Sequence, residues 1–126
     1  MPLNRILAVA IGGAIGATAR YLVTGWAQKA FGTEFPWGTA VVNVGGCFLI
    51  GFLMTLALEI SAMRPEVRLF LVTGILGGLT TFSTFGYETV RFVQEGASVA
   101  ALANLGLNLV AGLAAVMAGT WLARSL

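Results

Sequence analysis

The stretch LFLVTGILGGLTTFSTFGY, residues 69–87, decides the fold of this chain. It carries no charge, and its length nearly matches the hydrocarbon core of a bilayer. Its middle, from Gly77 to Gly86, is nevertheless rich in glycine, threonine and serine. Irregular backbone survives in lipid only where protein covers it or where it lines a watery cavity. We therefore predict that this span is broken near mid-membrane, with Gly77 to Thr80 not all helical, where a polar solute or ion is held.

The composition is typical of an integral membrane protein. Apolar residues make up 58% of the chain, charged residues make up 10%, and the mean hydropathy is +0.92. A soluble domain of 126 residues would need far more charge to stay dispersed. The net charge of +2 is small and comes from a few arginines, so it does not indicate a nucleic-acid partner.

The side chains that most catalytic chemistry requires are missing. The chain has no histidine and no aspartate, and Cys47 is its one cysteine. A disulfide within the chain and a Ser-His-Asp triad are therefore excluded, and a zinc site is disfavoured. We do not expect an enzyme.

Four apolar blocks, each near the length that crosses a bilayer, predict an all-α membrane protein with one transmembrane domain, residues 1–126. The expected spans are residues 6–27, 37–58, 69–93 and 98–123. The connections contain ordinary loop residues, among them Pro36, which suits the start of a helix. The first block also resembles a signal peptide, but more apolar chain follows it instead of a soluble domain.

The positive charges leave the orientation in the membrane open. One side of a four-span protein would carry Arg5, Arg64, Arg68 and Arg124, and the other would carry Lys29 and Arg91. The positive-inside rule leans weakly toward cytoplasmic termini. Insertion in both orientations would show such a weak bias, and so would a fixed topology with modest charge.

The glycines indicate close helix packing. There are 17, most of them within the spans, and Gly12 and Gly16 lie four residues apart. Small residues at this spacing let helix backbones approach each other. They fit packing within one chain and packing between copies about equally well.

Two polar side chains in the first two spans are candidates for a solute pathway. Arg20 shares a helix face with Gly12 and Gly16, and an arginine in a membrane must snorkel or find a partner. It is either an interfacial residue or a cation that draws anions into a vestibule. Asn43, one turn after Thr39, is either a link between helices or a donor that faces a permeating anion.

The third and fourth spans add further candidates. Phe82 and Phe85 lie on one helix face, and the positive edge of a phenyl ring can contact a small anion, although most such pairs face lipid or core. The hydroxyl side chains near the break are those of Thr80, Thr81, Ser83 and Thr84. Asn104 and Asn108 form either a polar track or an interhelical network. Glu88 either pairs with Arg91 or marks the end of a pathway.

Three motifs resemble the Fluc family of bacterial fluoride ion channels. They are Gly12-Gly13-x-x-Gly16-x-x-x-Arg20-Tyr21, then Gly38-Thr39-x-x-x-Asn43, then Gly77-Gly78-Leu79-Thr80-Thr81-Phe82-Ser83-Thr84-Phe85. The resemblance covers essentially the whole chain, since its length and four-span layout agree as well. The third motif is the most specific.

The resemblance implies a fluoride-selective channel of the bacterial inner membrane that lowers cytoplasmic fluoride by passive export. It implies a dual-topology homodimer, in which two antiparallel copies form two separate pores around a central structural sodium ion (Na⁺). The backbone carbonyls of Gly77 and Thr80 would bind this ion. The pore residues carried over are Arg20, Thr39, Asn43, Phe82, Ser83, Thr84, Phe85 and Glu88. The fourth span departs from the family, but an Asn108 amide can still donate to an anion.

Two other functions remain open at this point. A small proton-coupled multidrug-type exporter also has four short spans, but it needs a titratable carboxylate deep in a span. The candidates, Glu59 and Glu88, both lie near span ends. A non-transporting structural membrane protein would explain the glycines but not the polar break.

Overall fold

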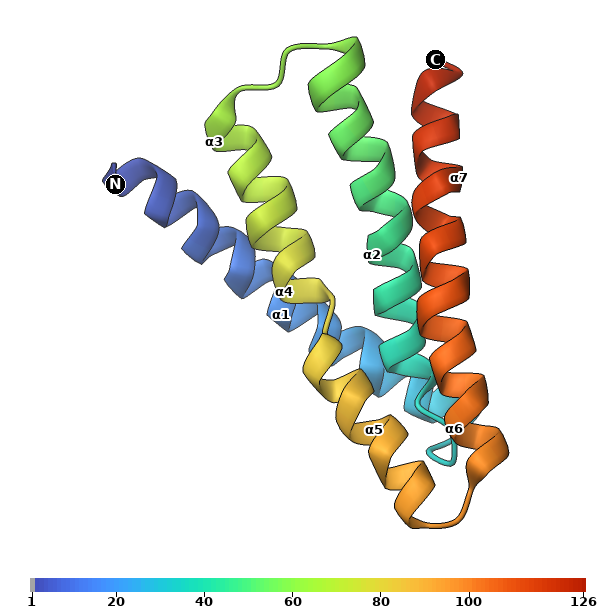
Figure 1. The fold of residues 1–126 in the computed structure, drawn as a ribbon. Helices are drawn as coiled ribbons and strands as arrows, with labels where there is room; N and C mark the ends of the chain where they lie inside the picture. The colour runs from blue at the N-terminus through green and yellow to red at the C-terminus, as the bar shows by residue number, and fades with distance from the viewer. Residues whose placement is uncertain (1) are drawn as a thin grey trace.

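The computed structural model describes residues 2–126, which form helices and connecting loops and no strand (Figure 1). Four helical segments are long and apolar enough to cross a membrane: Leu3–Phe31, Trp37–Ile60, Pro65–Gln94 and Ser98–Arg124. Each begins at or before the expected span and ends after it. Helical hydrogen bonds do not require apolar side chains, so a helix continues beyond the hydrophobic block that marks it.

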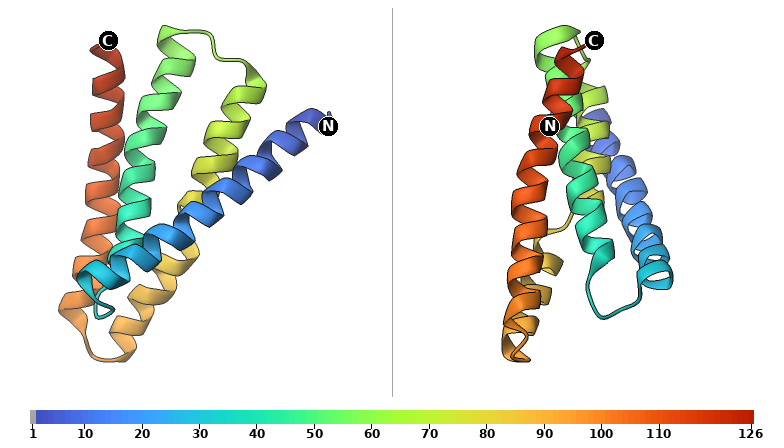
Figure 2. Two further views of the ribbon diagram at one scale, coloured as in Figure 1. Left: turned by 180° about the vertical axis from the view of Figure 1, so that it is seen from behind. Right: turned by 90° about the vertical axis from the view of Figure 1, so that its right-hand side faces the viewer.

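Both termini and the connection between the second and third segments lie at one end of the molecule (Figures 1 and 2). The other two connections lie at the opposite end. Helix α2 (Trp37–Thr55) packs lengthwise against α7 (Gly112–Arg124), and α1 (Leu3–Phe31) crosses the third segment at η2 (Leu69–Leu76). The long, thin shape leaves many apolar side chains exposed, as a membrane protein requires.

Glycines with positive φ mark the two connections at the lower end of Figure 1. Gly32 has a φ of 86° and its N–H donates to Gln28 O at 3.0 Å, which closes α1. Gly96, with a φ of 76°, turns the chain after α5 (Phe82–Gln94) toward α6 (Ser98–Leu105). Glycine adopts this backbone conformation without the steric cost that a Cβ would add.

Three stretches are wound as wider π-helix: η1 (Leu56–Ile60), η2 and η3 (Gly106–Ala111). Such turns are rare and often lie at functional sites. The third of them carries Asn108, and Asn104 lies just before it at the end of α6. Both asparagines are buried on the same side of the fourth segment.

Helical geometry in the third segment is interrupted at two threonines. After α3 (Pro65–Arg68) and η2, the short α4 (Gly77–Leu79) is still helical. Thr80 (φ −86°, ψ 157°) and Thr81 (φ −151°, ψ 117°) are extended, and α5 then begins at Phe82. Of residues 77–80, which the sequence predicts are not all helical, Thr80 leaves the helix and the two glycines stay in it. Side-chain hydrogen bonds, and not glycine flexibility, stabilise the extended backbone here. The Thr81 hydroxyl caps α5 by accepting from Thr84 N at 3.2 Å.

Several glycines lie at close contacts between helices of the chain. A methyl group on Gly12 would lie 2.9 Å from Gly74 Cα, and one on Gly16 would lie 2.9 Å from Leu79 N. A methyl on Gly119 would lie 2.8 Å from Phe52 N. These glycines let α1 meet the third segment and α7 meet α2 at backbone distance. Gly13, by contrast, has open space around it.

Candidate functional site

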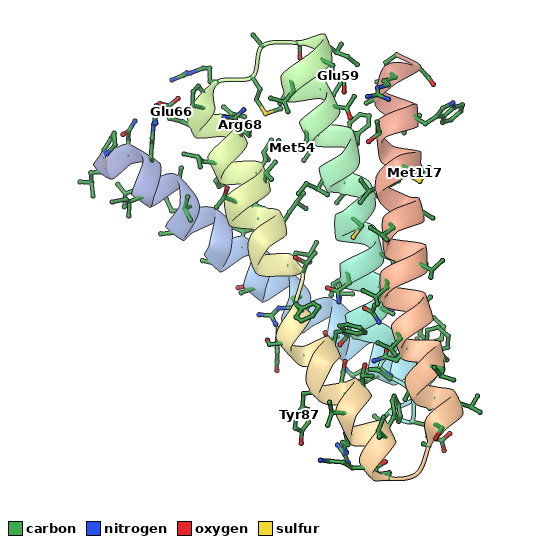
Figure 3. The ribbon with its side chains drawn as sticks, in the orientation of Figure 1. Met54, Glu59, Glu66, Arg68, Tyr87 and Met117 are labelled. Atoms are coloured by element: carbon green, nitrogen blue, oxygen red, sulfur yellow. The ribbon has the colours of Figure 1, made fainter. Side chains whose placement is uncertain are left out.

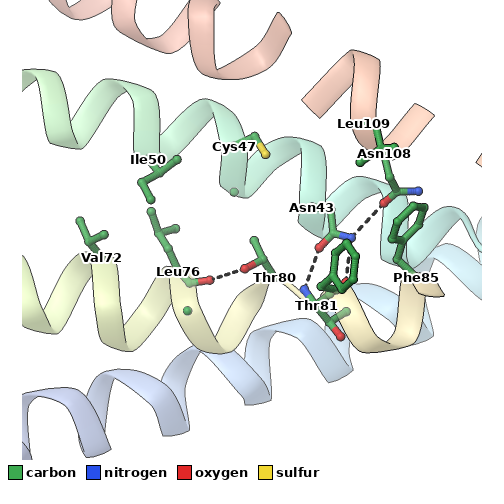
Figure 4. A pocket seen from close by; sticks show the side chains of 13 residues that line it. Asn43, Cys47, Ile50, Val72, Leu76, Thr80, Thr81, Phe85, Asn108 and Leu109 are labelled. Atoms are coloured by element: carbon green, nitrogen blue, oxygen red, sulfur yellow. Dashed lines mark hydrogen bonds between the residues drawn. The ribbon is translucent and has the colours of Figure 1, made fainter. Parts of the chain in front are cut away.

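Asn43 holds the interruption of the third segment from the neighbouring helix α2. Its Nδ2 donates to Thr81 O at 3.0 Å, and Thr81 N donates back to Asn43 Oδ1 at 2.7 Å (Figure 4). The side-chain amide therefore pairs with both backbone groups of one extended residue. Without water in the membrane, backbone groups that leave a helix need such partners. The contacts of Asn43 thus show a link between helices, one of the two alternatives that its position allows.

The carbonyls of Gly77 and Thr80 have the chemistry that a cation would require. In a regular helix they would accept from Thr81 N and Thr84 N. Thr81 N instead donates to Asn43, and Thr84 N donates to the Thr81 hydroxyl. Both carbonyls thereby lose their helical donor, and unwound carbonyls are ligands for sodium in membrane proteins. No cluster of three His, Cys, Asp or Glu that could hold a metal occurs within residues 2–126.

Arg20 lies beside the same interruption. Its Nε donates to Gly78 O at 3.1 Å, so the guanidinium has a partner within the protein. The arginine also lines a depression of about 920 Å³ together with Thr39, Thr84 and Glu88. It therefore lies at the edge of the interrupted helix, beside this depression.

A chain of amides continues from Asn43 into the fourth segment. Asn43 Nδ2 donates to Asn108 Oδ1 at 2.9 Å, and Asn108 Nδ2 donates to Asn104 O and Oδ1 at 2.9 and 3.1 Å. Asn104 Nδ2 donates to Thr89 Oγ1 at 2.9 Å. Asn104 and Asn108 thus form an interhelical network, one of the two alternatives that their spacing allows.

The two phenylalanines contact each other but differ in burial. Their ring centroids are 5.6 Å apart and the rings meet edge to face at 63°. Phe85 is only 5% exposed, whereas Phe82 is 78% exposed. The Phe85 ring therefore lies in the interior of the chain, and the Phe82 ring projects from its surface.

A mostly apolar pocket of about 330 Å³ opens beside this pair (Figure 4). It lies between α2, the third segment and η3. Its lining residues are Asn43, Gly46, Cys47, Ile50, Val72, Leu76, Gly77, Thr80, Thr81, Phe82, Phe85, Asn108 and Leu109. The pocket therefore brings Asn43, Asn108 and both phenylalanines together with the two residues whose carbonyls are candidate cation ligands.

The hydroxyl side chains of α5 divide into two groups. Thr84 is half-buried and bonds to the Thr81 hydroxyl at 3.0 Å, whereas Ser83 is exposed and its Oγ lies 3.5 Å from the same hydroxyl. Thr39, on α2, is buried and lies away from the pocket, where it bonds to Glu88. The structure thus brings Thr84 and Thr39 to the Arg20 depression and leaves Ser83 at the surface beside Phe82.

Glu88 does not pair with Arg91. Its Oε2 accepts from Thr39 Oγ1 at 3.1 Å, and its Oε1 is buried with no hydrogen-bond partner among residues 2–126. Arg91 pairs with Glu95 instead, at 2.8 Å. The ion-pair alternative for Glu88 is therefore wrong, because the Thr39 hydroxyl of α2 comes closer than the arginine on its own helix.

Glu59 and Glu66 lie at the end of the molecule that holds the termini (Figure 3). Glu59 accepts from Arg124 at 2.9 Å, and Glu66 lies 3.8 Å from Arg5. These ion pairs are exposed and tie the ends of the spans together. Glu59 therefore lies near a span end and is not the deep carboxylate that a proton-coupled exporter needs.

Sequence reasoning missed one residue of this site, Thr89, and it named Thr81 only as a hydroxyl near the break, without its role as a cap. Thr81 is the cap of α5 and the partner of Asn43, and Thr89 ends the amide network. Thr81 had a usable signal, because a threonine just before a helix is a preferred cap. Thr89 had none, since its partner Asn104 lies in the next span.

Four apolar helices with a polar interruption in the third define a multi-pass membrane protein. The family described as "CrcB-like protein, Camphor Resistance (CrcB)" matches residues 7–120 of the chain, and the chain belongs to this family. Two relatives share 48% and 47% identity over 122 residues, 97% of both chains: "Fluoride-specific ion channel FluC" of Anaeromyxobacter dehalogenans and of Chloroflexus aurantiacus. A relative of the same name from Geobacter sulfurreducens is 47% identical over 119 residues, 94% of this chain and 93% of its own.

Proposed function

We propose that this protein is a fluoride-selective channel of the bacterial inner membrane, which lowers cytoplasmic fluoride by passive export. The observation that carries the proposal is the interruption at Thr80 and Thr81, near the middle of the third segment, with a phenyl pair and neutral amides beside it. The printed names of the relatives support the ion, since each is called a fluoride-specific ion channel. Ion conduction requires no catalysed bond chemistry, in agreement with the lack of catalytic side chains.

The chemistry of the site suits a small, strongly hydrated anion. Removing water from fluoride is costly, so the path must supply replacement partners. Ring edges of Phe82 and Phe85 and neutral N–H and O–H donors can do this without a buried positive charge that would trap the ion. Asn43 and Asn108 line the pocket, and a shift of either amide toward an anion would replace a protein acceptor of its N–H group with the anion. Arg20 would raise the local anion concentration at the entrance.

Two inverted copies complete the proposed channel, with one pore on each side of their contact. The exposed ring of Phe82 and the open pocket beside Gly77 and Thr80 support a partner that covers this face. The carbonyls of Gly77 and Thr80 from both copies would hold a central sodium ion. When bound, this ion would supply a fixed positive charge that joins the interrupted helices.

The rival exporter is less well supported. Its coupling carboxylate would have to be Glu88, because Glu59 is paired with Arg124 at the end of the molecule. Glu88 lies beside the Arg20 depression and is held by a single hydroxyl. A structural protein without transport would have no use for the interruption.

Fluoride efflux from liposomes tests the proposal directly. Purified protein is reconstituted into vesicles loaded with potassium fluoride, and a fluoride electrode follows release after a potassium ionophore is added. We expect fast release that needs no pH gradient. Release no faster than from vesicles without protein would overturn the proposal.

A further inference from the structure

Asn104 is completely buried although it is polar. It is 0% exposed and is the largest fully buried side chain among residues 2–126. A primary amide inside a membrane-spanning helix is costly unless its donors and acceptor are paired. Asn104 does not line the pocket beside Phe82 and Phe85. Its burial therefore calls for a role other than contact with a solute in that pocket.

One side of Asn104 reaches the backbone of Phe85 through a single hydroxyl. Asn104 Nδ2 donates to Thr89 Oγ1 at 2.9 Å, and Thr89 Oγ1 donates to Phe85 O at 2.8 Å. A hydroxyl has one hydrogen, and because Thr89 donates it to Phe85 O, Thr89 can only accept from Asn104. The two bonds therefore form one directed link from α6 to the first turn of α5.

The other side of Asn104 reaches the cap of the same turn. Its Oδ1 accepts from Asn108 Nδ2 at 3.1 Å, and Asn108 Oδ1 accepts from Asn43 Nδ2 at 2.9 Å. Asn43 in turn pairs with Thr81. One continuous network thus holds both Thr81, which begins the first turn of α5, and the carbonyl of Phe85, which lies one turn later.

We propose that Asn104 is a positioning residue for the pore. It fixes the first turn of α5 against α2 and α6, and it thereby holds the buried ring of Phe85 at the orientation that favours fluoride over chloride. This inference rests on the proposed function and adds the origin of selectivity to it. Buried networks of this kind rigidify their surroundings only when every member is satisfied.

Substitutions at Thr89 test the link without altering Asn104 itself. Thr89→Val removes the hydroxyl at nearly constant volume, and Thr89→Ser keeps it. Thr55→Val is the matched control, because Thr55 is 5% exposed and its hydroxyl also donates to the carbonyl four residues earlier, Gly51 O at 2.7 Å. Thr55 lies near the opposite end of α2 and has no bond to the network.

Two measurements read the result. Hydrogen exchange follows the amides of residues 82–89, and liposome flux gives the ratio of fluoride to chloride permeability. We expect Thr89→Val to raise the exchange rates of these amides by about tenfold and to lower the fluoride-to-chloride permeability ratio by about tenfold. The reason is that the buried Asn104 amide loses its acceptor, the Thr89 hydroxyl. Asn104→Leu should lower the ratio similarly, whereas Thr89→Ser and Thr55→Val should stay within about twofold of the unmodified protein.

The outcomes separate this inference from the proposed function. Unchanged exchange in Thr89→Val would overturn the positioning role, whatever the flux shows. Faster exchange with an unchanged permeability ratio would overturn the role in selectivity, because lower stability alone reduces the amount of active protein and leaves the ratio intact. An unmodified protein that releases no fluoride would overturn the proposed function and the selectivity role together, while exchange would still report on the network.

Discussion

The exposed ring of Phe82 allows its role to be tested without disturbing the core. Phe82 is 78% exposed, so Phe82→Ile removes an aromatic edge but little internal packing. If the edge contacts fluoride, we expect the efflux rate to fall by about tenfold or more, the equivalent of one such contact. The measurement is electrode-monitored efflux at equal amounts of reconstituted protein.

Phe31→Ile is the matched control for this substitution. Phe31 is 56% exposed, and its ring contacts Trp26 and Trp37 near the end of α1, away from the interruption. Its efflux should equal that of the unmodified protein. If Phe82→Ile folds normally and releases fluoride as fast as the unmodified protein, the Phe82 ring edge does not contribute to conduction.

Asn43 is expected to matter for stability as well as for conduction. Asn43→Ala would leave Thr81 N and Thr81 O, on a residue that is only 9% exposed, without their hydrogen-bond partners. We expect a loss in the free energy of unfolding of roughly 1–3 kcal/mol for each buried group left unpaired. Thermal unfolding in detergent measures this, with Asn4→Ala, at the exposed start of α1, as the control. Equal melting temperatures for the two variants would mean that the amide does not hold the interruption.

At the scale of helices, two glycines of α1, Gly13 and Gly16, lead to opposite predictions. A Cβ on Gly16 would clash with the backbone of Ile75 and Leu79, whereas one on Gly13 would meet nothing within 4 Å. Gly16→Ala should therefore destabilise the protein by about 1–3 kcal/mol through overpacking. Gly13→Ala should be neutral or gain up to about 1 kcal/mol from helix propensity. Urea unfolding of both variants measures this. Midpoint urea concentrations that shift in the same direction and by the same amount in Gly16→Ala and Gly13→Ala would contradict this packing.

The four helices could be predicted from sequence because long apolar blocks leave few alternatives in a membrane. The residues at which the third segment departs from helix could not. Glycine content pointed to Gly77 through Thr80, but the extended residues are Thr80 and Thr81. Their conformation depends on Asn43, which is 38 residues away in the sequence. The spacing of Asn104 and Asn108 likewise could not decide between a polar track and an interhelical network. The deciding contact, from Asn104 to Thr89, forms only when α6 packs against α5.

At the scale of the whole molecule, Glu88 separates a passive channel from a coupled exporter. Its carboxylate is held by Thr39 alone, and Glu88→Gln keeps an acceptor for that hydroxyl. A channel does not need the proton that a carboxylate carries, so efflux should persist and change by less than about tenfold from the altered local charge. Flux with and without a pH gradient measures this. Transport that needs the gradient, and that Glu88→Gln abolishes, would favour the exporter.

Insertion in two orientations is the remaining property on which the proposed dimer depends. The end that holds the termini carries four arginines and the opposite end carries only Lys29 and Arg91, a difference too small to fix one orientation firmly. With Cys47→Ser as background, single cysteines at Ser125 and at Glu95 mark the two ends. A membrane-impermeant maleimide should then label about half of each cysteine from outside intact cells, because antiparallel pairs present both ends equally. Complete labelling at one position and none at the other would show a single orientation, and two inverted copies could not then form the pore.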